Sequence, residues 1–390
     1  MISLKLAYRN LIGAGIRTWL NVFVLSLSFV IIIMHKGMLD GWNRQARLDT
    51  IDWEIGGGQY WHEVYDPYDP FTIIDSHGTI PEEMQAGITS GNLTPVLISQ
   101  ATIYPEGRMQ SALLKGIDPS QKVLKIPTKQ LNSDSDEIPA LIGTRMADNN
   151  KLNVGDYLTV RWRDVDGTFD AAEVIITGIF KTNVPAVDVA QLWIPIKDLS
   201  QMLQMPDEAT IIVCGKDFTG QGNINGWEFK DHKFLLADIE EMIKMKSIGG
   251  AVLYVILMAL ALLAIFDTQV LSVFRRQKEI GTYMAMGMTR GQVIRLFTVE
   301  GGMHGILAAG VAAIYGIPLL AFLATKGISM PEGTDSYGLT IGESIFPTYS
   351  LGLVIGTIII VLLTTTIVSF LPARKIAKMK PTEALKGKLQ

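Results

Sequence analysis

The chain has 390 residues, of which 48% are hydrophobic and only 18% are charged, and its mean hydropathy is positive at +0.28. This composition argues against an ordinary water-soluble protein and favours a protein embedded in a membrane. Cys214 is the only cysteine, which excludes an intramolecular disulfide bond.

The chain begins with a basic, amphipathic segment followed by an apolar run. Residues 1–16 place most of their apolar side chains on one helical face, which predicts a helix lying in the membrane interface. The apolar run Leu20–Met34 is short for a bilayer core of about 30 Å. It becomes adequate over 17–39, with His35 and Lys36 snorkelling at the far edge. A cleaved signal peptide is the alternative, and it is disfavoured because no small-residue A-x-A site follows Met34.

The first span is expected to continue as a helical stalk through Asp49, because nothing breaks the helix before Gly56, Gly57 and Gly58. The aromatic stretch Gln59–Phe71 suits core or membrane-surface packing better than a site for an apolar ligand. Beyond it the pattern changes to β-rich runs.

Strand patterns dominate 95–214. A hairpin is predicted around Pro105–Gly107 and another around Asp164–Thr168. The second could resemble a calcium loop, but the twelfth position of an EF-hand beginning at Asp164 is Ile175 rather than Glu, so we interpret it as a turn. Residues 134–137 are interpreted as a solvated loop. Short helices are predicted at Pro81–Gly87, Thr144–Asn150 and Ile196–Leu203, which makes the domain α+β.

The C-terminal third contains three further apolar runs. Phe234–Lys246 is amphipathic and predicts a second stalk that leads directly into a membrane helix. We predict the following order: membrane helix 247–271, basic connector 272–300, membrane helix 301–324, short loop 325–349, membrane helix 350–371 and basic tail 372–390.

Charge asymmetry predicts the orientation in the membrane. The N-terminal segment, the connector and the tail together hold 14 basic residues against three glutamates, whereas the loop 325–349 has one lysine and three acidic residues. Both termini and the connector are therefore expected in the cytoplasm of a cell with an inner membrane, and the domain 40–246 is expected in the periplasm. The fold class is thus a membrane α-helical protein with four transmembrane helices and a large α+β extracytoplasmic domain inserted between helices 1 and 2.

The outer segment His35–Lys246 is acidic, with 19 Lys and Arg against 31 Asp and Glu. A net charge of −12 argues against binding to nucleic acid or to anionic lipid head groups.

Small residues recur at helical spacing within the spans. Gly301 and Gly305 form one G-x-x-x-G pattern, and Gly352 and Gly356 form another. Such spacing permits close helix packing within one chain or across a dimer. Asp267 is the only acidic residue inside an apolar run; it either lines an ion path or snorkels toward Arg275 or Arg276.

Motifs of catalysis and metal binding do not occur. The sequence contains no G-x-x-x-x-G-K-[ST] loop for ATP phosphates, no H-E-x-x-H and no G-x-S-x-G, and its five histidines are scattered. We expect no cofactor in this chain and no enzymatic activity of its own.

Three stretches together resemble the FtsX/MacB-like permeases of ABC systems, also called type VII or mechanotransmission transporters. The first is Leu6–Leu11. The second is Arg276–Gly281, followed by Met284–Gly287 and Phe297–Gly301. The third is Leu371–Arg374, followed by Pro381–Leu385. Ile142–Gly143, Leu152–Asp156 and Thr177–Phe180 are similar to the periplasmic core of that family.

The resemblance implies a dimeric permease, with an identical or a different second permease, bound to a cytosolic ABC ATPase dimer that holds ATP and magnesium. Glu279–Thr289 of the connector would be a coupling helix seated in a groove of the ATPase. Ile280, Met284 and Met288 recur every four residues and could form its apolar ridge, and Glu279, Arg290 and Arg295 could orient it through ion pairs. The coupling residues predicted from this match are Glu279, Ile280, Gly281, Met284, Ala285, Met286, Gly287, Met288, Thr289 and Arg290.

The function implied is an envelope transporter in which ATP hydrolysis moves the periplasmic domain, acting on a lipoprotein, a peptide or an amphiphile. A periplasmic or outer-membrane acceptor protein would be a further partner. Two alternatives remain: a signalling subunit that activates a cell-wall hydrolase or a sensor without transport, and an ion-coupled carrier that depends on Asp267. The resemblance leaves the substrate undetermined, because Leu114–Pro119 is similar to the lipoprotein-releasing branch and Arg276–Gly281 to the exporter branch.

Overall fold

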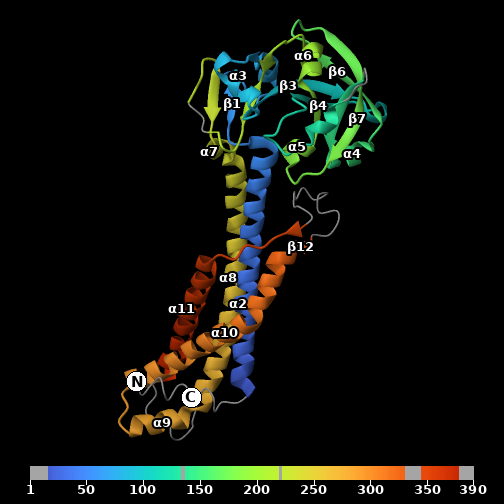
Figure 1. The fold of residues 1–390 in the computed structure, drawn as a ribbon. Coiled ribbons are helices and arrows are strands. Elements are labelled where there is room, and N and C mark those ends of the chain that lie inside the picture. Colours follow the sequence, from blue (N-terminus) through green and yellow to red (C-terminus); the bar gives the residue numbers. More distant parts are fainter. Residues whose placement is uncertain (1–15, 133–136, 219–221, 330–343, 377–390) are drawn as a thin grey trace. The chain divides into compact units, whose positions relative to one another are not determined.

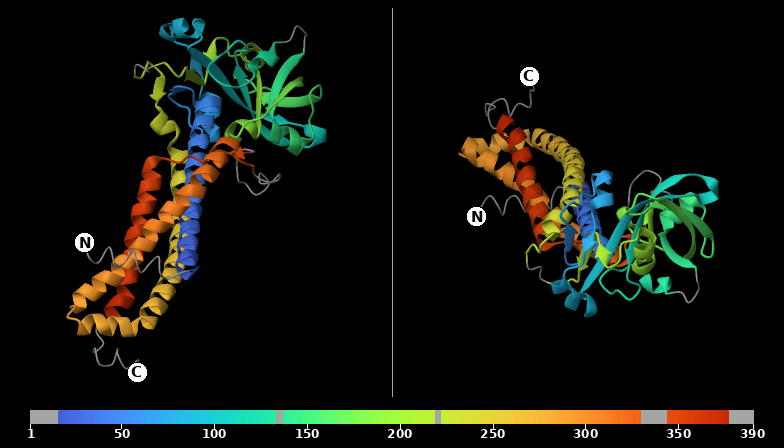
Figure 2. Two further views of the ribbon diagram at one scale, coloured as in Figure 1. Left: turned by 60° about the horizontal axis from the view of Figure 1, so that its bottom comes forward. Right: turned by 90° about the horizontal axis from the view of Figure 1, so that it is seen from above.

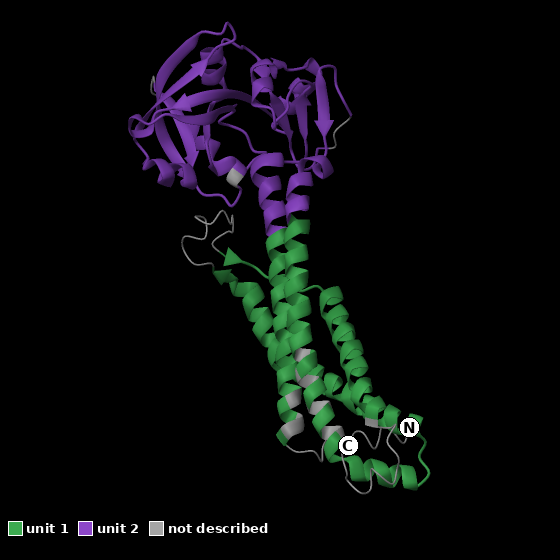
Figure 3. Cartoon of the chain, turned by 180° about the vertical axis from the view of Figure 1, so that it is seen from behind, with its two compact units in different colours: residues 1–43, 243–329, 344–390 green, residues 44–242, 330–343 purple. Residues whose placement is uncertain are grey.

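A computed structural model describes residues 16–132, 137–218, 222–329 and 344–376, in two compact units. Unit 1 comprises residues 1–43, 243–329 and 344–390, and unit 2 comprises 44–242 and 330–343 (Figure 3). The predicted interfacial helix 1–16 lies outside the described residues except for Ile16. Residues 134–136 of the predicted loop 134–137 and the tail beyond Ile376 also lie outside them.

Unit 1 is built from helices. Four helices in the described part of the chain are long and apolar enough to cross a membrane (Figure 1). The helices and the small hairpin are α2 (Ile16–Thr50), α8 (Ala237–Arg275), α9 (Gln277–Ala285), α10 (Arg290–Lys326), α11 (Leu351–Ile376), β12 (Ile328–Ser329) and β13 (Ser344–Ile345). As predicted, α2 continues well beyond the apolar run, and α8 joins the second stalk and the second span in one helix.

The helices of unit 1 share an apolar core. Phe29 and Val30 of α2 pack with Ala308 of α10 and Val361 of α11. α2 and α8 lie side by side (Figure 2), with Leu39 close against Gly250 and the Lys246 ammonium 3.8 Å from the centre of the Trp42 ring. Such packing of small and large side chains is how helices associate where water supplies no driving force.

Unit 2 contains the sheets and the short helices. Its elements after α2 are η1 (Ile51–Ile55), β1 (Gln59–His62), η2 (Pro70–Asp75), β2 (Gly78–Thr79), α3 (Glu82–Thr89), β3 (Leu93–Ile103), η3 (Pro105–Gly107), β4 (Gln110–Ile117), η4 (Thr128–Leu131), β5 (Ile138–Gly143), α4 (Thr144–Asn150), β6 (Tyr157–Arg163), β7 (Phe169–Phe180), α5 (Pro185–Asp188), β8 (Gln191–Pro195), α6 (Ile196–Leu203), β9 (Glu208–Ala209), β10 (Ile211–Cys214), β11 (Trp227–Lys230) and α7 (His232–Leu235). Both predicted hairpins, β3–β4 and β6–β7, are confirmed by their antiparallel registers.

Six strands of unit 2 close into a barrel. They follow the order β3-β4-β8-β5-β7-β6, and a direct pairing of β3 with β6 completes the ring. Alternate side chains of each strand fill the interior, including Leu97, Leu114, Val160, Trp162 and Ile176. A barrel of so few strands leaves no room for a channel, so its interior is a packed core. The sequence predicted the strands but not this closure.

The remaining strands extend the sheet beyond the barrel. β10, β1 and β11 follow β3 in the order β3-β10-β1-β11, and α3 packs on this part through Met84. A second apolar cluster lies outside the barrel, where Val96 and Ile98 of β3 meet Trp193 of β8 and Phe180 of β7.

Candidate functional site

The connector between α8 and α10 forms a compact turn around α9. α9 ends at Ala285, and Gly287 follows with φ +98°, a conformation that favours glycine. Thr289 then caps α10: its hydroxyl accepts from the Gln292 backbone N–H, and the Gln292 side chain accepts from the Thr289 N–H. This reciprocal capping box defines where α10 begins.

The apolar residues of the connector pack inward. Ile280 is only 1% exposed and lies with Val293 and Phe297 of α10 and Ala373 of α11. Met284 and Met288 are partly buried against the same cluster. Ile280 of the predicted ridge therefore packs against its own chain, and Met284 and Met288 do so in part. The contact of these residues with an ATPase stays a prediction.

A charged pair beneath α9 fixes its geometry. The Arg276 guanidinium donates to both carboxylate oxygens of Glu300 at 3.0 Å and to Glu279 Oε2 at 2.7 Å. Burial of the Arg276 guanidinium tends to lower its pKa. The carboxylates of Glu300 and Glu279 outweigh this effect, so the pKa of Arg276 is raised. Glu279 thus forms an ion pair within its own chain, and its role in orienting the connector stays a prediction. Arg290 and Arg295 form no ion pair within the described residues.

Sequence reasoning missed Glu300. Its side chain is 7% exposed, which makes it a buried partner for a charge 24 positions earlier in the chain. An acidic residue at the edge of an apolar run beside a basic connector was the available signal.

The solvent-facing side of the connector differs from the predicted ridge. Thr282, Ala285, Met286, Gly287 and Arg290 are exposed, and Met286 is the most prominent apolar side chain at 69% exposure. Gly281 is buried within α9. The arrangement presents a small, mixed apolar and basic surface on a firmly anchored helix.

Residues 251–381 match the family model described as the FtsX-like permease C-terminal domain. Over 321 residues the chain is 23% identical to the lipoprotein-releasing system transmembrane protein LolC of Xylella fastidiosa, covering 75% of this chain and 76% of that protein. The macrolide export ATP-binding/permease protein MacB of Vibrio parahaemolyticus is 33% identical over 123 residues, 32% of this chain and 16% of that protein. The chain is an FtsX/MacB-like ABC transporter permease.

A third relative is an uncharacterised ABC transporter permease of Methanocaldococcus jannaschii, MJ1507, which is 29% identical to the permease over 170 residues. That match spans 41% of this chain and only 39% of the relative.

The glycines of the spans have different surroundings in the permease. Gly301 and Gly305 are both buried, and a Cβ at Gly305 would lie 2.8 Å from Leu362 of α11, so this glycine permits close packing of α10 on α11. Gly352 and Gly356 instead line a cavity of about 240 Å³ within unit 1, and a Cβ at Gly356 would meet no atom within 4 Å.

Asp267 lies exposed on α8. Within the described part of the permease no salt bridge joins it to Arg275 or Arg276, and the guanidinium of Arg276 is already held by Glu300 and Glu279. The predicted snorkelling contact is therefore not formed.

At the other end of α2, within unit 2, the helix is fastened to the sheet. Its last turn widens into the π-helix η1, where the Gly56 N–H donates to Ile51 O at 2.8 Å. Asp52 forms ion pairs with Lys125 and Lys216, and the ring of Trp53 stacks on that of Phe180 at 5.7 Å. Widened turns of this kind are frequent at functional sites.

The glycine triplet completes this junction. The Gly57 N–H donates to Cys214 O at 2.7 Å, and a Cβ at Gly57 would lie 2.1 Å from Gly215 O. Only glycine allows the chain to approach β10 so closely. Nearby, Lys115 of β4 is buried with its ammonium 5.0 Å from the centre of the Trp193 ring, and burial lowers its pKa, although the carboxylate of Glu54 opposes that effect. The top of α2 and the sheet thus form one connected structure.

Proposed function

We propose that this permease couples ATP hydrolysis by a separate cytosolic ATPase to movement of unit 2, and that unit 2 acts outside the inner membrane on an amphiphile, a peptide or a lipoprotein. Support for the class of system comes from the FtsX-like domain and from relatives whose names denote lipoprotein release and macrolide export.

The observation that carries the proposal is the connector. A short helix held by a buried ion pair and an apolar cluster moves with α10 and α11 rather than independently. Force applied at the exposed Met286 would therefore reach the spans. α2 and α8 each continue from unit 1 into unit 2, and an ion pair between Arg47 and Glu240 (3.4 Å) joins them within unit 2. These helices provide the physical route for transmission.

Met286→Asp tests this proposal. The substitution places a charge, which is costly to desolvate, on the exposed surface without altering the buried cluster. We therefore expect the variant to insert normally into the membrane. It should no longer co-purify with the ATPase or stimulate ATP hydrolysis. Met109→Asp is the matched control, because Met109 is similarly exposed (74%) but lies in unit 2. Wild-type ATPase binding by Met286→Asp would contradict the assignment.

Two other substitutions in the connector are less selective. Met284→Asp would bury a charge in the apolar cluster, and Gly281→Pro would break α9 at a cost of about 3 kcal/mol. Both would therefore disturb the fold as well as the surface.

A further inference from the structure

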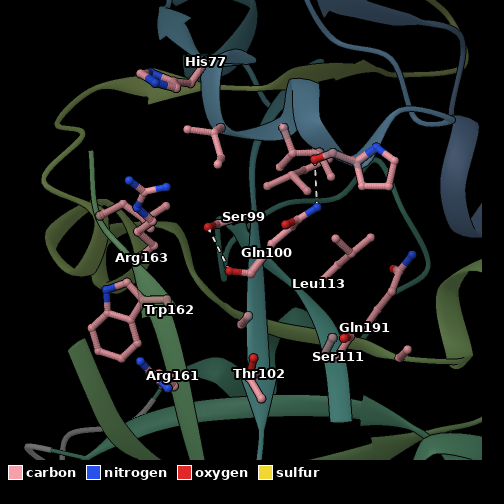
Figure 4. A pocket seen from close by; sticks show the side chains of 18 of the residues that line it. His77, Ser99, Gln100, Thr102, Ser111, Leu113, Arg161, Trp162, Arg163 and Gln191 are labelled. Carbon is pink, nitrogen blue, oxygen red and sulfur yellow. Dashed lines mark hydrogen bonds between the residues drawn. The ribbon is translucent and has the colours of Figure 1, made fainter. Parts of the chain in front are cut away.

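A cavity of about 810 Å³ lies within unit 2, a volume inside the range of about 300–1,000 Å³ that is typical of ligand pockets. It lies against β3, β4 and β6 of the barrel, beside η2 and the segment after α5 (Figure 4). None of its lining residues belongs to the connector, so the cavity is distinct from the site described above.

Most of the lining is apolar, and part of it is unusually exposed. Leu113 and Trp162 contribute from the strands, whereas Ile74, Phe169 and Val189 line the cavity with 47%, 62% and 45% of their surface exposed. Apolar surface left in water is unfavourable, at about 25 cal/mol per Å². A hydrocarbon chain in this cavity would remove such surface from water.

Two arginines line the same cavity without a carboxylate partner among the described residues. The Arg161 guanidinium lies 4.4 Å from the centre of the Phe169 ring, and Arg163 Nε donates to Gly167 O at 3.0 Å. The nearest acidic group in sequence, Asp164, accepts from the Thr168 N–H and from Gln204. His77, at another part of the lining, is bonded to Glu208.

These unpaired cations occur in a domain that is strongly acidic. Residues 35–246 carry 31 acidic against 19 basic side chains, yet both Arg161 and Arg163 face the cavity lining free of ion pairs in the described chain. Arginine binds carboxylate and phosphate through parallel hydrogen bonds. Asp164 also lines the cavity, but its two carboxylate oxygens accept from Thr168 and Gln204. Arg161 and Arg163 therefore complement an anionic head group.

The sheet favours an acyl chain over an extended peptide. A peptide gains affinity by adding main-chain hydrogen bonds to a free strand edge. β4 is paired with β3 on one side and β8 on the other, and β3 is paired with β4 and, at its two ends, with β10 and β6. Within these two strands only the short stretches 97–100 of β3 and 110–112 of β4 lack a second neighbouring strand.

We propose that this cavity binds a single-chain amphiphile with an anionic head group, the hydrocarbon chain lying along Ile74, Leu113 and Phe169 and the head group on Arg161 and Arg163. This proposal deepens the proposed function by naming a substrate class, and it rests on that function for the placement of unit 2 outside the membrane.

The test uses the full chain in phosphatidylcholine nanodiscs and a photoreactive diazirine derivative of dodecanoate, with labelled peptides identified by mass spectrometry. We expect labelling on β4 and β6, competed by unlabelled dodecanoate. Labelling by dodecanoate should fall about tenfold in the double variant Arg161→Gln/Arg163→Gln, because the head group loses its charge-assisted bonds. The matched control is Arg108→Gln, an exposed arginine outside the cavity, which should label like wild type.

A second pair of measurements separates charge from shape. The uncharged diazirine dodecanol should label wild type and the double variant equally, whereas Ser111→Trp, which fills the cavity from β4, should reduce labelling by both probes. Unchanged dodecanoate labelling in the arginine double variant, or labelling of unit 1 alone, would overturn the proposal, as would better competition by an acidic peptide than by dodecanoate. No ATPase is present, so a failure here leaves the coupling assignment intact, and loss of coupling in Met286→Asp leaves this binding unchanged.

Discussion

Arg276 has two carboxylate partners that differ in burial. Glu300 is 7% exposed and accepts two hydrogen bonds from the guanidinium, whereas Glu279 is 55% exposed and accepts one. Surface ion pairs contribute about 0–1 kcal/mol, but removing one member of a buried pair leaves the other charge uncompensated. Removing each partner of Arg276 in turn therefore compares the stability contributed by a buried ion pair with that of an exposed one.

Glu300→Gln is expected to lower the free energy of unfolding of the permease by about 2–3 kcal/mol, because Arg276 then remains desolvated with only one exposed partner. Glu279→Gln should cost no more than about 0.5–1 kcal/mol. Thermal unfolding in mild detergent, followed by circular dichroism, measures both. Equal destabilisation by the two variants would show that the Glu300 pair does not anchor α9.

The sequence predicted part of this site. An ion pair was predicted for Glu279 without its partner, which in the structure is Arg276, three positions earlier. The burial of Ile280 and the Arg276–Glu300 pair depend on the angle at which α9 folds back on α10. A four-residue apolar repeat does not indicate whether its apolar side chains contact a partner or the same chain. The repeat likewise gave no sign that Met286, which lies between Met284 and Met288 in the sequence, is the exposed methionine.

At the level of elements, α10 packs on α11 through a glycine. The substitution Gly305→Leu would place a side chain where a Cβ alone already meets Leu362 at 2.8 Å and the Thr365 hydroxyl at 3.1 Å. Overpacking of this kind costs about 1–3 kcal/mol, so we expect a lower melting temperature in detergent.

Gly310→Leu on the same helix is the matched control, because a Cβ there would meet nothing within 4 Å. Leucine is also a better helix former than glycine, by up to about 1 kcal/mol. We expect its melting temperature to equal or exceed that of wild type. A Gly305→Leu variant as stable as Gly310→Leu would contradict the packing of α10 on α11.

Individual helices were predictable where the helical sequence pattern and the residues that end a helix agree. The helices α4 and α6 occupy the predicted ranges, and α2 runs to the region of the glycine triplet. The closure of the barrel was not predictable. Ala101–Ile103 pair with Val160–Trp162, almost 60 positions away, and the hydrophobic periodicity of a strand does not indicate which strand it pairs with. The cavity of unit 2 arises from the same non-local contacts.

At the scale of the whole chain, the FtsX-like match covers the last three membrane helices and the connector, and unit 2 lies outside it. The match to LolC of Xylella fastidiosa covers 75% of the chain and therefore includes parts of both regions. The proposed coupling requires the connector and unit 2 to lie on opposite faces of the membrane, so that an ATPase at one acts on the other.

Site-directed cysteine labelling tests that statement most directly. The native Cys214 is fully buried and burial raises the pKa of its thiol to about 12, so it should contribute little background. Cysteines are introduced separately at Met109 and Met286, both of which are exposed. A membrane-impermeant maleimide is then applied to intact spheroplasts expressing each variant, and to the same cells after permeabilisation.

We predict that Met109→Cys is labelled in intact spheroplasts and that Met286→Cys is labelled only after permeabilisation. Labelling of both positions, or of Met286→Cys alone, in intact spheroplasts would contradict the transmission of force from the connector to unit 2 across the membrane.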